Sequence, residues 1–293
     1  MPTDITTATY AQVYARSLAD PEGFWAEQAA AIPWVEAPEK ILEKDQNGVW
    51  RWFSDGVLNS CYVALDQHVI AGRGEQTALI YDSPVTGMVQ HFTYAQLLEK
   101  TATIAGGLAD LGVAKGDVVV IYMPMVPETV AAMLACARIG AIHSVVFGGF
   151  APKELAMRID DANPKVVLAA SCGIEGDRVI AYQPLLNDAI DLAAHKPDHV
   201  VMLQRPQCEA TLAAPRDIDW LTWEGDASPV DCVPVKATDP LYVLYTSGTT
   251  GKPKGIVRDN GGHAVALNYS MSAVYGVGVG DVYWAASDVG WVV

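Results

Sequence analysis

Short apolar segments alternate with amphipathic ones through the middle of the chain. Val118–Met123, Ile142–Val146 and Val166–Ala170 are mainly apolar, a pattern typical of strands that are buried on both faces. Between them, residues 127–138 and 153–161 carry apolar positions at helical spacing. Single helices between buried strands predict βαβ units. We therefore expect an α/β fold with a mostly parallel sheet and flanking helices.

Capping residues and glycines predict where these elements begin and end. Thr93 has a glutamine three residues later, which is the spacing of a capping box, and apolar positions at helical spacing follow over residues 94–111. Gly112 is placed to end that helix. The alternation continues with a helix over 185–194 and a strand over 200–203.

The first 67 residues lack this regularity and are rich in aromatic side chains. Trp25, Trp34, Trp50 and Trp52 are half of the eight tryptophans. We expect an irregular N-terminal cap over 1–67 whose aromatic side chains anchor it against a larger domain over 68–293. A stacking platform for carbohydrate or nucleic acid is the alternative, and the cap's lack of a basic patch disfavours it.

Composition and charge narrow the class of protein. Of 293 residues, 51% are hydrophobic and 18% are charged, which indicates an ordered globular chain. The formal net charge of −15 disfavours binding to nucleic acid. Anionic substrates must then be met by local cations and backbone N–H groups, because the overall field repels them.

Cysteine spacing and the chain ends give further expectations. The five cysteines form no C-x-x-C pair, so we expect reduced thiols, no metal site and no disulfide framework. The first residues show no signal peptide and no apolar stretch is long enough to span a membrane, so we expect a cytoplasmic protein. The last residues, 290–293, are apolar and resemble a buried strand, so we expect a chain truncated at its C-terminus.

A glycine-rich segment, Y-T-S-G-T-T-G-K-P-K-G from Tyr245 to Gly255, lies between two predicted strands. Glycines allow close backbone approach, and hydroxyls and lysines suit phosphate oxygens. The G-x-x-x-x-G-K-[ST] spacing is not met, which disfavours a kinase-like phosphoryl transferase. A surface turn with two solvated lysines is the bland alternative. The predicted phosphate loop comprises Thr246, Ser247, Gly248, Thr249, Thr250, Gly251, Lys252 and Lys254.

This segment resembles the signature of the acyl-adenylate-forming superfamily. From Tyr10 onward the chain is similar to the N-terminal half of a short-chain acyl-CoA synthetase. H-S-V-V-F-G-G-F (143–150) is close to the pattern of acetate-activating members. R-D-N-G-G-H-A-V (258–265) and I-E-G-D-R (174–178) resemble the propionate-activating, AMP-forming members.

The resemblance implies roles for particular residues. Lys254 would be catalytic within the phosphate loop. Phe147, Gly148, Gly149 and Arg178 would contact CoA, although Glu175 stands where the family carries another arginine. Trp291, Val292 and Val293 would border the acyl pocket. The structural alternatives are a tight turn at Gly148–Gly149, a core histidine at His263, an Arg258–Asp259 pair and a turn residue at Asp288.

The resemblance also implies an activity. Propionate would attack ATP to give an acyl-adenylate and pyrophosphate, and CoA would then displace AMP, with Mg²⁺ assisting. The family's catalytic lysine and metal-binding carboxylate would lie beyond Val293, so we expect the 293-residue chain alone to lack turnover. The alternatives are an acetyl-CoA synthetase or a non-catalytic nucleotide- or acyl-binding fragment. The oligomeric state is open.

Overall fold

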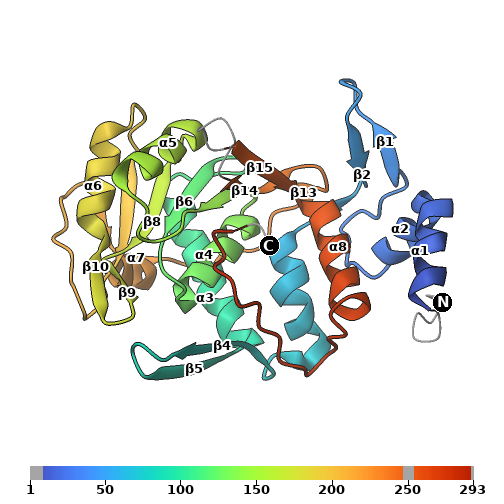
Figure 1. Cartoon of the computed structure of the whole chain (residues 1–293), viewed down its shortest axis with the longest axis horizontal. Helices are drawn as coiled ribbons and strands as arrows, with labels where there is room; N and C mark the ends of the chain where they lie inside the picture. Colours follow the sequence, from blue (N-terminus) through green and yellow to red (C-terminus); the bar gives the residue numbers. More distant parts are fainter. Residues whose placement is uncertain (1–8, 247–253, 292–293) are drawn as a thin grey trace.

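The computed structural model describes residues 9–246 and 254–291, and these form a seven-stranded sheet with helices on both faces (Figure 1). The strand order is β12 (Asp217–Asp219), β11 (His199–Leu203), β8 (Val166–Ala170), β6 (Val118–Tyr122), β7 (Ile142–Val145), β14 (Pro240–Thr246) and β15 (Lys254–Asp259). Neighbours are parallel except for β15, which runs antiparallel to β14. The predicted α/β class and mostly parallel sheet are confirmed.

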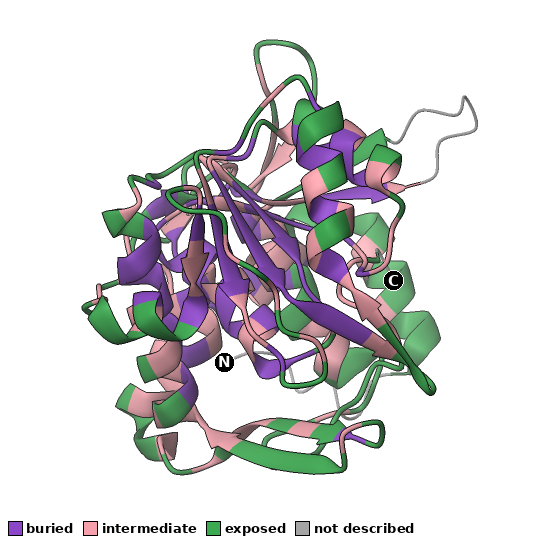
Figure 2. Ribbon diagram, turned by 90° about the vertical axis from the view of Figure 1, so that its left-hand side faces the viewer, coloured by how far each residue is buried: buried purple, intermediate pink, exposed green. Residues whose placement is uncertain are grey.

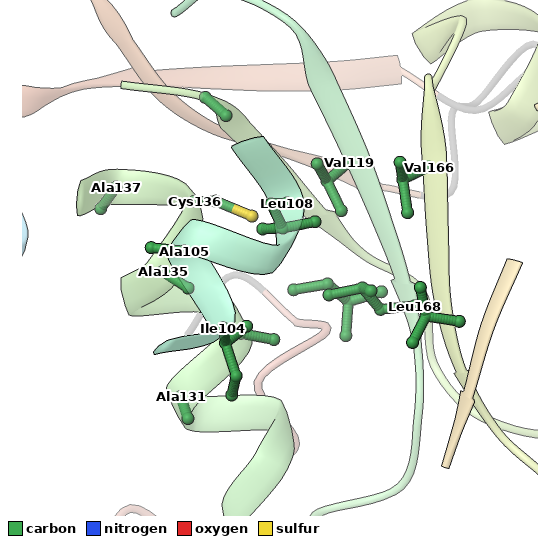
Figure 3. Packing of buried hydrophobic residues seen from close by; sticks show 14 of the residues in the cluster. Ile104, Ala105, Leu108, Val119, Ala131, Ala135, Cys136, Ala137, Val166 and Leu168 are labelled. Atoms are coloured by element: carbon green, nitrogen blue, oxygen red, sulfur yellow. The ribbon is translucent and has the colours of Figure 1, made fainter. Parts of the chain in front are cut away.

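Strand residues alternate between two apolar layers. On β6, Val119 and Ile121 pack with α3 (Tyr94–Asp110) and α4 (Pro127–Arg138), whereas Val120 and Tyr122 pack on the other face with α5 (Pro152–Ala162) and α6 (Tyr182–Leu192). Both layers are buried, which explains why the strand is apolar throughout. Figure 3 shows the first layer, where the alanines of α4 lie against Ile104 and Leu108 of α3.

The predicted capping signals act as expected. Thr93 Oγ1 accepts from the Gln96 N–H at 3.2 Å, and Gln96 Oε1 accepts from the Thr93 N–H at 3.0 Å. Gly112 has a φ of +78°, which favours glycine. The helix predicted over 127–138 and the strand predicted over 166–170 have the predicted bounds.

The N-terminal segment is more regular than the sequence indicates. It contains α1 (Tyr10–Ala19), α2 (Pro21–Ala29), the β1 (Leu42–Lys44) and β2 (Trp50–Trp52) hairpin, and β3 (Val57–Leu58), which pairs with β13 (Val235–Lys236). The prediction of an irregular segment was therefore wrong. Thr9 and Gln12 form a capping box for α1, and Asp20 caps α2. Helix α1 buries no residue, although Tyr10, Val13, Tyr14 and Leu18 stand at helical spacing along it.

Aromatic side chains pack the N-terminal segment against α8 (Asn260–Ala273) and β13. Trp25 lies edge-on to Tyr269 of α8, with ring centroids 5.4 Å apart. The Trp34 indole N–H donates to the Ala29 carbonyl at 2.8 Å. Trp50 differs from the expectation, because it is 58% exposed with the Lys44 ammonium over its ring.

The remaining elements lie outside the sheet. The π-helical turns η1 (Tyr62–Asp66) and η2 (Val69–Arg73) lead to an exposed hairpin of β4 (Thr77–Ser83) and β5 (Met88–Thr93), at the bottom of Figure 2. A second hairpin, β9 (Cys172–Glu175) and β10 (Arg178–Ala181), precedes α6, and α7 (Trp220–Asp226) follows β12. Among the residues described, no helix is both long and apolar enough to cross a membrane.

The predicted buried strand over 290–293 is not found where the chain is described. Gly290 and Trp291 form a turn, Trp291 is 47% exposed, and residues 292 and 293 lie outside the described ranges. The Asp288 carboxylate accepts from the Gly290 N–H at 2.7 Å, which closes this turn. A turn stabilised by its own aspartate replaces the expected strand.

Candidate functional site

Three segments leave the sheet at the carboxyl ends of β7, β8 and β14. The chain passes from β6 to its neighbour β7 and then back across β6 to β8, so α4 and α5 cover opposite faces. Ligands of open α/β sheets bind at such a change of direction, outside the carboxyl ends of the strands. The segments after these three strands therefore form the candidate site.

The segment after β7 is held by Tyr122 at the end of β6. The Gly149 N–H donates to Tyr122 Oη at 3.3 Å, and the Tyr122 hydroxyl donates to the Phe150 carbonyl at 3.3 Å. Burial raises the pKa of Tyr122 to about 12, so the phenol keeps its proton. Gly149 has a φ of +94°, which favours glycine. The Gly149 N–H is already hydrogen-bonded, so it is not free to donate to a ligand. Because Gly149 has no side chain, a ligand could still approach its backbone closely.

Tyr182 packs between the segments that follow β7 and β8. A Cβ added at Gly148 would lie 2.3 Å from Tyr182 Oη, and one added at Gly173 would lie 2.0 Å from it. Both positions therefore require glycine for packing reasons. The Tyr122 and Tyr182 rings also contact each other, with centroids 5.0 Å apart. The Gly148–Gly149 pair is thus built into an aromatic support and is more than a tight turn.

Three aromatic rings gather in front of this support. Phe147 and Phe150 have centroids 5.6 Å apart, and Trp291 lies 6.2 Å from Phe147 and 6.5 Å from Phe150. One cavity is lined by Val145, Val146, Phe147, Phe150, Arg158, Tyr245, Gly290 and Trp291. The structure therefore brings Phe147, predicted for CoA, and Trp291, predicted for the acyl pocket, to the same cavity.

The sequence analysis missed Arg158, which lines this cavity from α5. Its guanidinium is buried, donates to the Glu154 carbonyl at 2.7 Å and lies 3.2 Å from the Glu154 carboxylate. It also lies over the Phe150 ring at 4.7 Å and over Tyr245 at 5.6 Å. An arginine between the core positions Leu155 and Ile159 is the signal that could have identified it. A buried cation of this kind suits an anionic ligand.

The predicted phosphate loop begins and ends on paired strands. Thr246 at the end of β14 lies directly opposite Lys254 at the start of β15. Tyr245, one residue earlier, donates its hydroxyl to Asp161 Oδ2 of α5 at 2.7 Å, which fixes the start of the loop against α5. The other predicted members lie outside the described residues: Ser247, Gly248, Thr249, Thr250, Gly251 and Lys252.

Arg178, the basic residue predicted for CoA, does not line this cavity. It is exposed on β10, directly opposite Glu175 on β9. Glu175 Oε1 lies 3.4 Å from the position of a Cβ at Gly149, so it places a negative charge beside the glycine pair. A second basic residue, Arg205, is buried after β11 and donates from Nη1 to the Cys172 carbonyl at 2.9 Å. Because the Glu175 carboxylate lies beside the glycine pair, the surroundings of this pair are less favourable for a phosphate group than the sequence predicts.

The R-D-N-G-G-H segment makes packing contacts. Asn260 Oδ1 accepts from the Ser60 hydroxyl at 2.6 Å, and a Cβ at Gly261 would lie 2.4 Å from the Ala237 Cβ. The His263 ring lies edge-on to Tyr242, 5.2 Å between centroids. Burial lowers the pKa of His263 to about 4, so the imidazole is neutral near pH 7. These contacts match a core histidine and not a catalytic base.

The described residues at this site do not provide a set of ligands for Mg²⁺. Thr246 and Lys254 offer a hydroxyl and a cation, which suit an anion, and the Asp161 carboxylate is hydrogen-bonded to Tyr245. The His, Cys, Asp and Glu side chains that cluster in the described ranges are Cys61, Asp66 and Cys232, which do not line the cavity.

Two family models match the chain. The model described as AMP-binding enzyme matches residues 66–293, and the model described as acetyl-coenzyme A synthetase N-terminus matches residues 10–64. The second match lies on the segment that packs through tryptophans against α8. The first contains the sheet and all three site segments.

Individual proteins are similar over nearly the whole chain. The chain is 52% identical over 285 residues to acyl-CoA synthetase short-chain family member 3, mitochondrial, of Homo sapiens, which covers 97% of this chain and 42% of that protein. It is 43% identical over 287 residues to propionate–CoA ligase of Escherichia coli, covering 97% of this chain and 46% of that protein. The chain spans about half the length of the curated relatives it matches.

A solved structure is similar in fold. Acetoacetyl-CoA synthetase from Streptomyces lividans matches with a TM-score of 0.87 and 25% sequence identity, covering 97% of this chain and 43% of that one. The arrangement of sheet, flanking helices and N-terminal segment is therefore shared with a protein of this kind.

Proposed function

The chain belongs to the AMP-binding enzyme family, and on that premise we propose that the whole protein activates a short-chain carboxylate, propionate first among them, and transfers it to CoA. ATP and CoA are the proposed co-substrates, and Mg²⁺ is the proposed metal. The observation that carries the proposal is the pairing of Thr246 with Lys254 on β14 and β15, on either side of the glycine-rich segment. This hairpin starts beside the cavity that Tyr245 lines.

The first proposed step joins the carboxylate to AMP. A carboxylate oxygen attacks the α-phosphorus of ATP, the bond from that phosphorus to the bridging oxygen breaks, and pyrophosphate leaves with the electron pair. Two anions must meet, so the barrier is largely electrostatic. Lys254 and the Thr246 hydroxyl would face the departing pyrophosphate, and the buried Arg158 would favour the carboxylate in the cavity.

The second proposed step transfers the acyl group. The CoA thiolate attacks the carbonyl carbon, and the bond from that carbon to the AMP oxygen breaks. Gly149 lacks a side chain in the segment after β7, which supports close approach by CoA beside Phe147. The carboxylate of Glu175 weighs against phosphate at this position, so we propose that Arg178 meets a CoA phosphate farther out on the β9–β10 hairpin.

Propionate is proposed on two grounds. The R-D-N-G-G-H-A-V segment resembles the propionate-activating members, and the chain is 43% identical to propionate–CoA ligase of Escherichia coli. The described contacts of that segment include Ser60, Ala237, Asp239 and Tyr242, none of which lines the cavity. We therefore propose that the segment marks the family and does not itself touch the acyl chain. The acyl chain would instead meet Trp291, with Val292 and Val293 as proposed neighbours.

The test compares acids on the whole protein. Initial rates with acetate, propionate and butyrate, with AMP and ADP separated by chromatography, give kcat/KM and the product. We expect AMP as the product and the highest kcat/KM with propionate. A difference of one methylene is worth about 1–3 kcal/mol in an apolar pocket, so acetate and butyrate should be slower by roughly 10- to 200-fold.

The outcomes separate the alternatives. A kcat/KM for acetate equal to or above that for propionate would assign the protein to acetate activation. ATP binding without any AMP formation, for every acid tested, would leave a non-catalytic binding protein. Formation of ADP would exclude adenylation altogether.

A further inference from the structure

Two cysteines that are far apart in sequence, Cys61 and Cys232, lie close together beside Arg138 of α4. Cys61 begins η1 in the N-terminal segment, and Cys232 lies three residues before β13. The Sγ atoms of Cys61 and Cys232 and a carboxylate oxygen of Asp66 all lie within 4.8 Å of one another. Cys61 is fully buried and Cys232 is partly exposed, so the cluster has an opening to solvent at Cys232.

Arg138 of α4 holds the three side chains together. Its Nη1 lies 3.1 Å from Cys232 Sγ and 3.6 Å from Cys61 Sγ, and it donates to Asp66 at 2.9 Å. Its Nε donates to the Val230 carbonyl at 2.6 Å, so the guanidinium is fixed from both ends. A fixed positive charge beside two sulfur atoms stabilises a thiolate.

Asn59 fixes the backbone around both cysteines. Its Oδ1 accepts from the Cys61 N–H at 2.9 Å. Its Nδ2 donates to the carbonyl of Val233, the residue after Cys232, at 2.8 Å. The Val233 N–H in turn donates to the Arg138 carbonyl at 2.9 Å. The two sulfur atoms are therefore kept near each other by hydrogen bonds that do not involve sulfur.

A metal ion does not fit this cluster. Cys61, Asp66 and Cys232 would offer three ligand atoms, but the Arg138 guanidinium already contacts all three groups. A cation would have to displace a buried arginine that is also bonded to Val230. Repulsion between the two positive charges would be strong at this depth.

The proton distribution supports thiol chemistry. A hydrogen bond from Cys232 and the nearby charge of Arg138 hold the pKa of Cys61 below its ordinary value, although burial opposes this. The same hydrogen bond and burial raise the pKa of Cys232. The two sulfur atoms are therefore unequal, with ionisation favoured at Cys61 and disfavoured at Cys232.

We propose that Cys61 and Cys232 form a redox site that a hydroperoxide converts to a disulfide. A thiolate sulfur attacks the terminal oxygen of the hydroperoxide, the O–O bond breaks and the sulfur becomes a sulfenic acid. The departing alkoxide, or hydroxide from hydrogen peroxide, takes a proton from solvent and leaves as an alcohol or water. The second sulfur attacks the sulfenic sulfur, and the departing hydroxide takes the second thiol's proton and leaves as water. The thiols lose two electrons and two protons in total, and the hydroperoxide is the oxidant.

The bond would join two parts of the fold. Cys61 belongs to the N-terminal segment, and Cys232 belongs to the segment that leads through β13 to β14 and the predicted phosphate loop. A link across so long a stretch of chain restricts the unfolded state. The oxidised protein should therefore have a higher Tm than the reduced protein.

The experiment uses the purified, metal-free protein with hydrogen peroxide. After oxidation the remaining thiols are alkylated, the protein is digested without reductant, and linked peptides are identified by mass spectrometry. We expect a Cys61–Cys232 peptide that is lighter by two hydrogens than its separate halves, two fewer alkylated thiols and a raised Tm. Dithiothreitol should reverse all three changes.

Two variants sharpen the result. Cys232→Ser should abolish the linked peptide and the Tm shift, whereas Cys208→Ser, which removes another partly exposed cysteine, should retain both. Even if Cys232→Ser folds poorly, peptide mapping of the oxidised wild-type protein shows whether Cys61 and Cys232 are linked. The proposal is overturned if Cys61 and Cys232 stay unlinked at peroxide concentrations that oxidise Cys208. It is also overturned if the only linked pair is Cys172–Cys208, or if added zinc binds stoichiometrically and protects both thiols.

Discussion

Lys254 stands opposite Thr246 at the point where β14 and β15 meet the predicted phosphate loop. Its exposed ammonium is available to a polyanion, and the paired strands fix where its backbone lies. Because pyrophosphate leaves in the first proposed step, a lysine that faces it should matter little in the second.

We predict that Lys254→Ala slows adenylation much more than thioester formation. Loss of one charge-assisted contact costs about 1.5–3 kcal/mol, or roughly ten- to more than a hundredfold in rate. Single-turnover reactions from ATP and from preformed propionyl-adenylate separate the two steps, with Lys44→Ala on the exposed β1–β2 hairpin as control. Equal losses in both reactions would show that Lys254 is structural.

His263 gives a prediction for pH. Burial lowers its pKa to about 4, from an ordinary value near 6.5. Below about pH 6.5 the unfolded chain gains a proton at His263 that the folded chain does not accept until about pH 4. Folding stability should therefore fall with falling pH across this window, with a contribution from His263 of at most about 1.4 kcal/mol per pH unit.

Urea unfolding between pH 4.5 and 7.5 measures this effect. His263→Gln should reduce the slope of unfolding free energy against pH, while the buried His143 keeps its own contribution. His91→Gln, at an exposed position on β5, is the control and should give the wild-type slope. If the slopes of His263→Gln and the wild type coincide, His263 takes up its proton equally in both states.

At the scale of elements, the segments after β7 and β8 depend on Tyr182. Gly148→Ala would place a methyl group 2.3 Å from Tyr182 Oη and force the two segments apart. Overpacking of this kind costs about 1–3 kcal/mol, and we predict a matching loss in unfolding free energy together with a raised KM for CoA.

Gly225→Ala on α7 is the matched control, because a Cβ there meets nothing within 4 Å. It should leave KM unchanged and stabilise the helix by about 0.5–1 kcal/mol. A Gly148→Ala protein with the wild-type KM and stability would contradict the tight packing around Tyr182.

The central elements could be predicted from sequence because both faces of the sheet are covered. Strands such as β8 are then apolar at every position, and the intervening helices carry apolar residues on the face that packs against the sheet, with a proline at the start of α4 and of α5. The β4–β5 hairpin was missed for the opposite reason, because β5 is largely exposed and shows no regular apolar alternation. Helix α1 carries apolar residues at helical spacing, so its sequence does contain a signal for a helix.

The candidate site was only partly predictable. Local motifs identify Thr246, Lys254 and the Gly148–Gly149 pair, because backbone requirements leave a mark in sequence. Arg158 has a local signal, because it lies between two core positions of its helix, but its place in the cavity depends on contacts between distant segments. The cysteine cluster also depends on such contacts, and no local pattern marks it. Arg178 was placed by resemblance, and its position opposite Glu175 comes only from strand register.

At the scale of the whole molecule, Asn59 joins the N-terminal segment to the sheet domain. Its Nδ2 donates to the carbonyls of Ala137, Arg138 and Val233, all within 3.1 Å. Asn59→Ala leaves these carbonyls without that donor, and we predict a loss of about 2–5 kcal/mol in unfolding free energy.

Asn47→Ala, in the exposed turn between β1 and β2, is the control and should change the unfolding free energy by less than about 0.5 kcal/mol. Urea unfolding followed by tryptophan fluorescence reports on both parts, since tryptophans lie in each. An Asn59→Ala protein as stable as Asn47→Ala would show that the aromatic contacts hold the two parts together unaided.

The cytoplasmic location stays a prediction of the sequence.

Every step of the proposed function depends on formation of an acyl-adenylate, which pyrophosphate exchange measures. The whole protein is incubated with ATP, labelled pyrophosphate, Mg²⁺ and propionate in the absence of CoA, and label in ATP is measured. We predict that label enters ATP only when propionate is present and that Lys254→Ala reduces the exchange rate about tenfold or more. Exchange that is independent of any carboxylate, or no exchange with acids that are nevertheless converted to CoA esters, would contradict it.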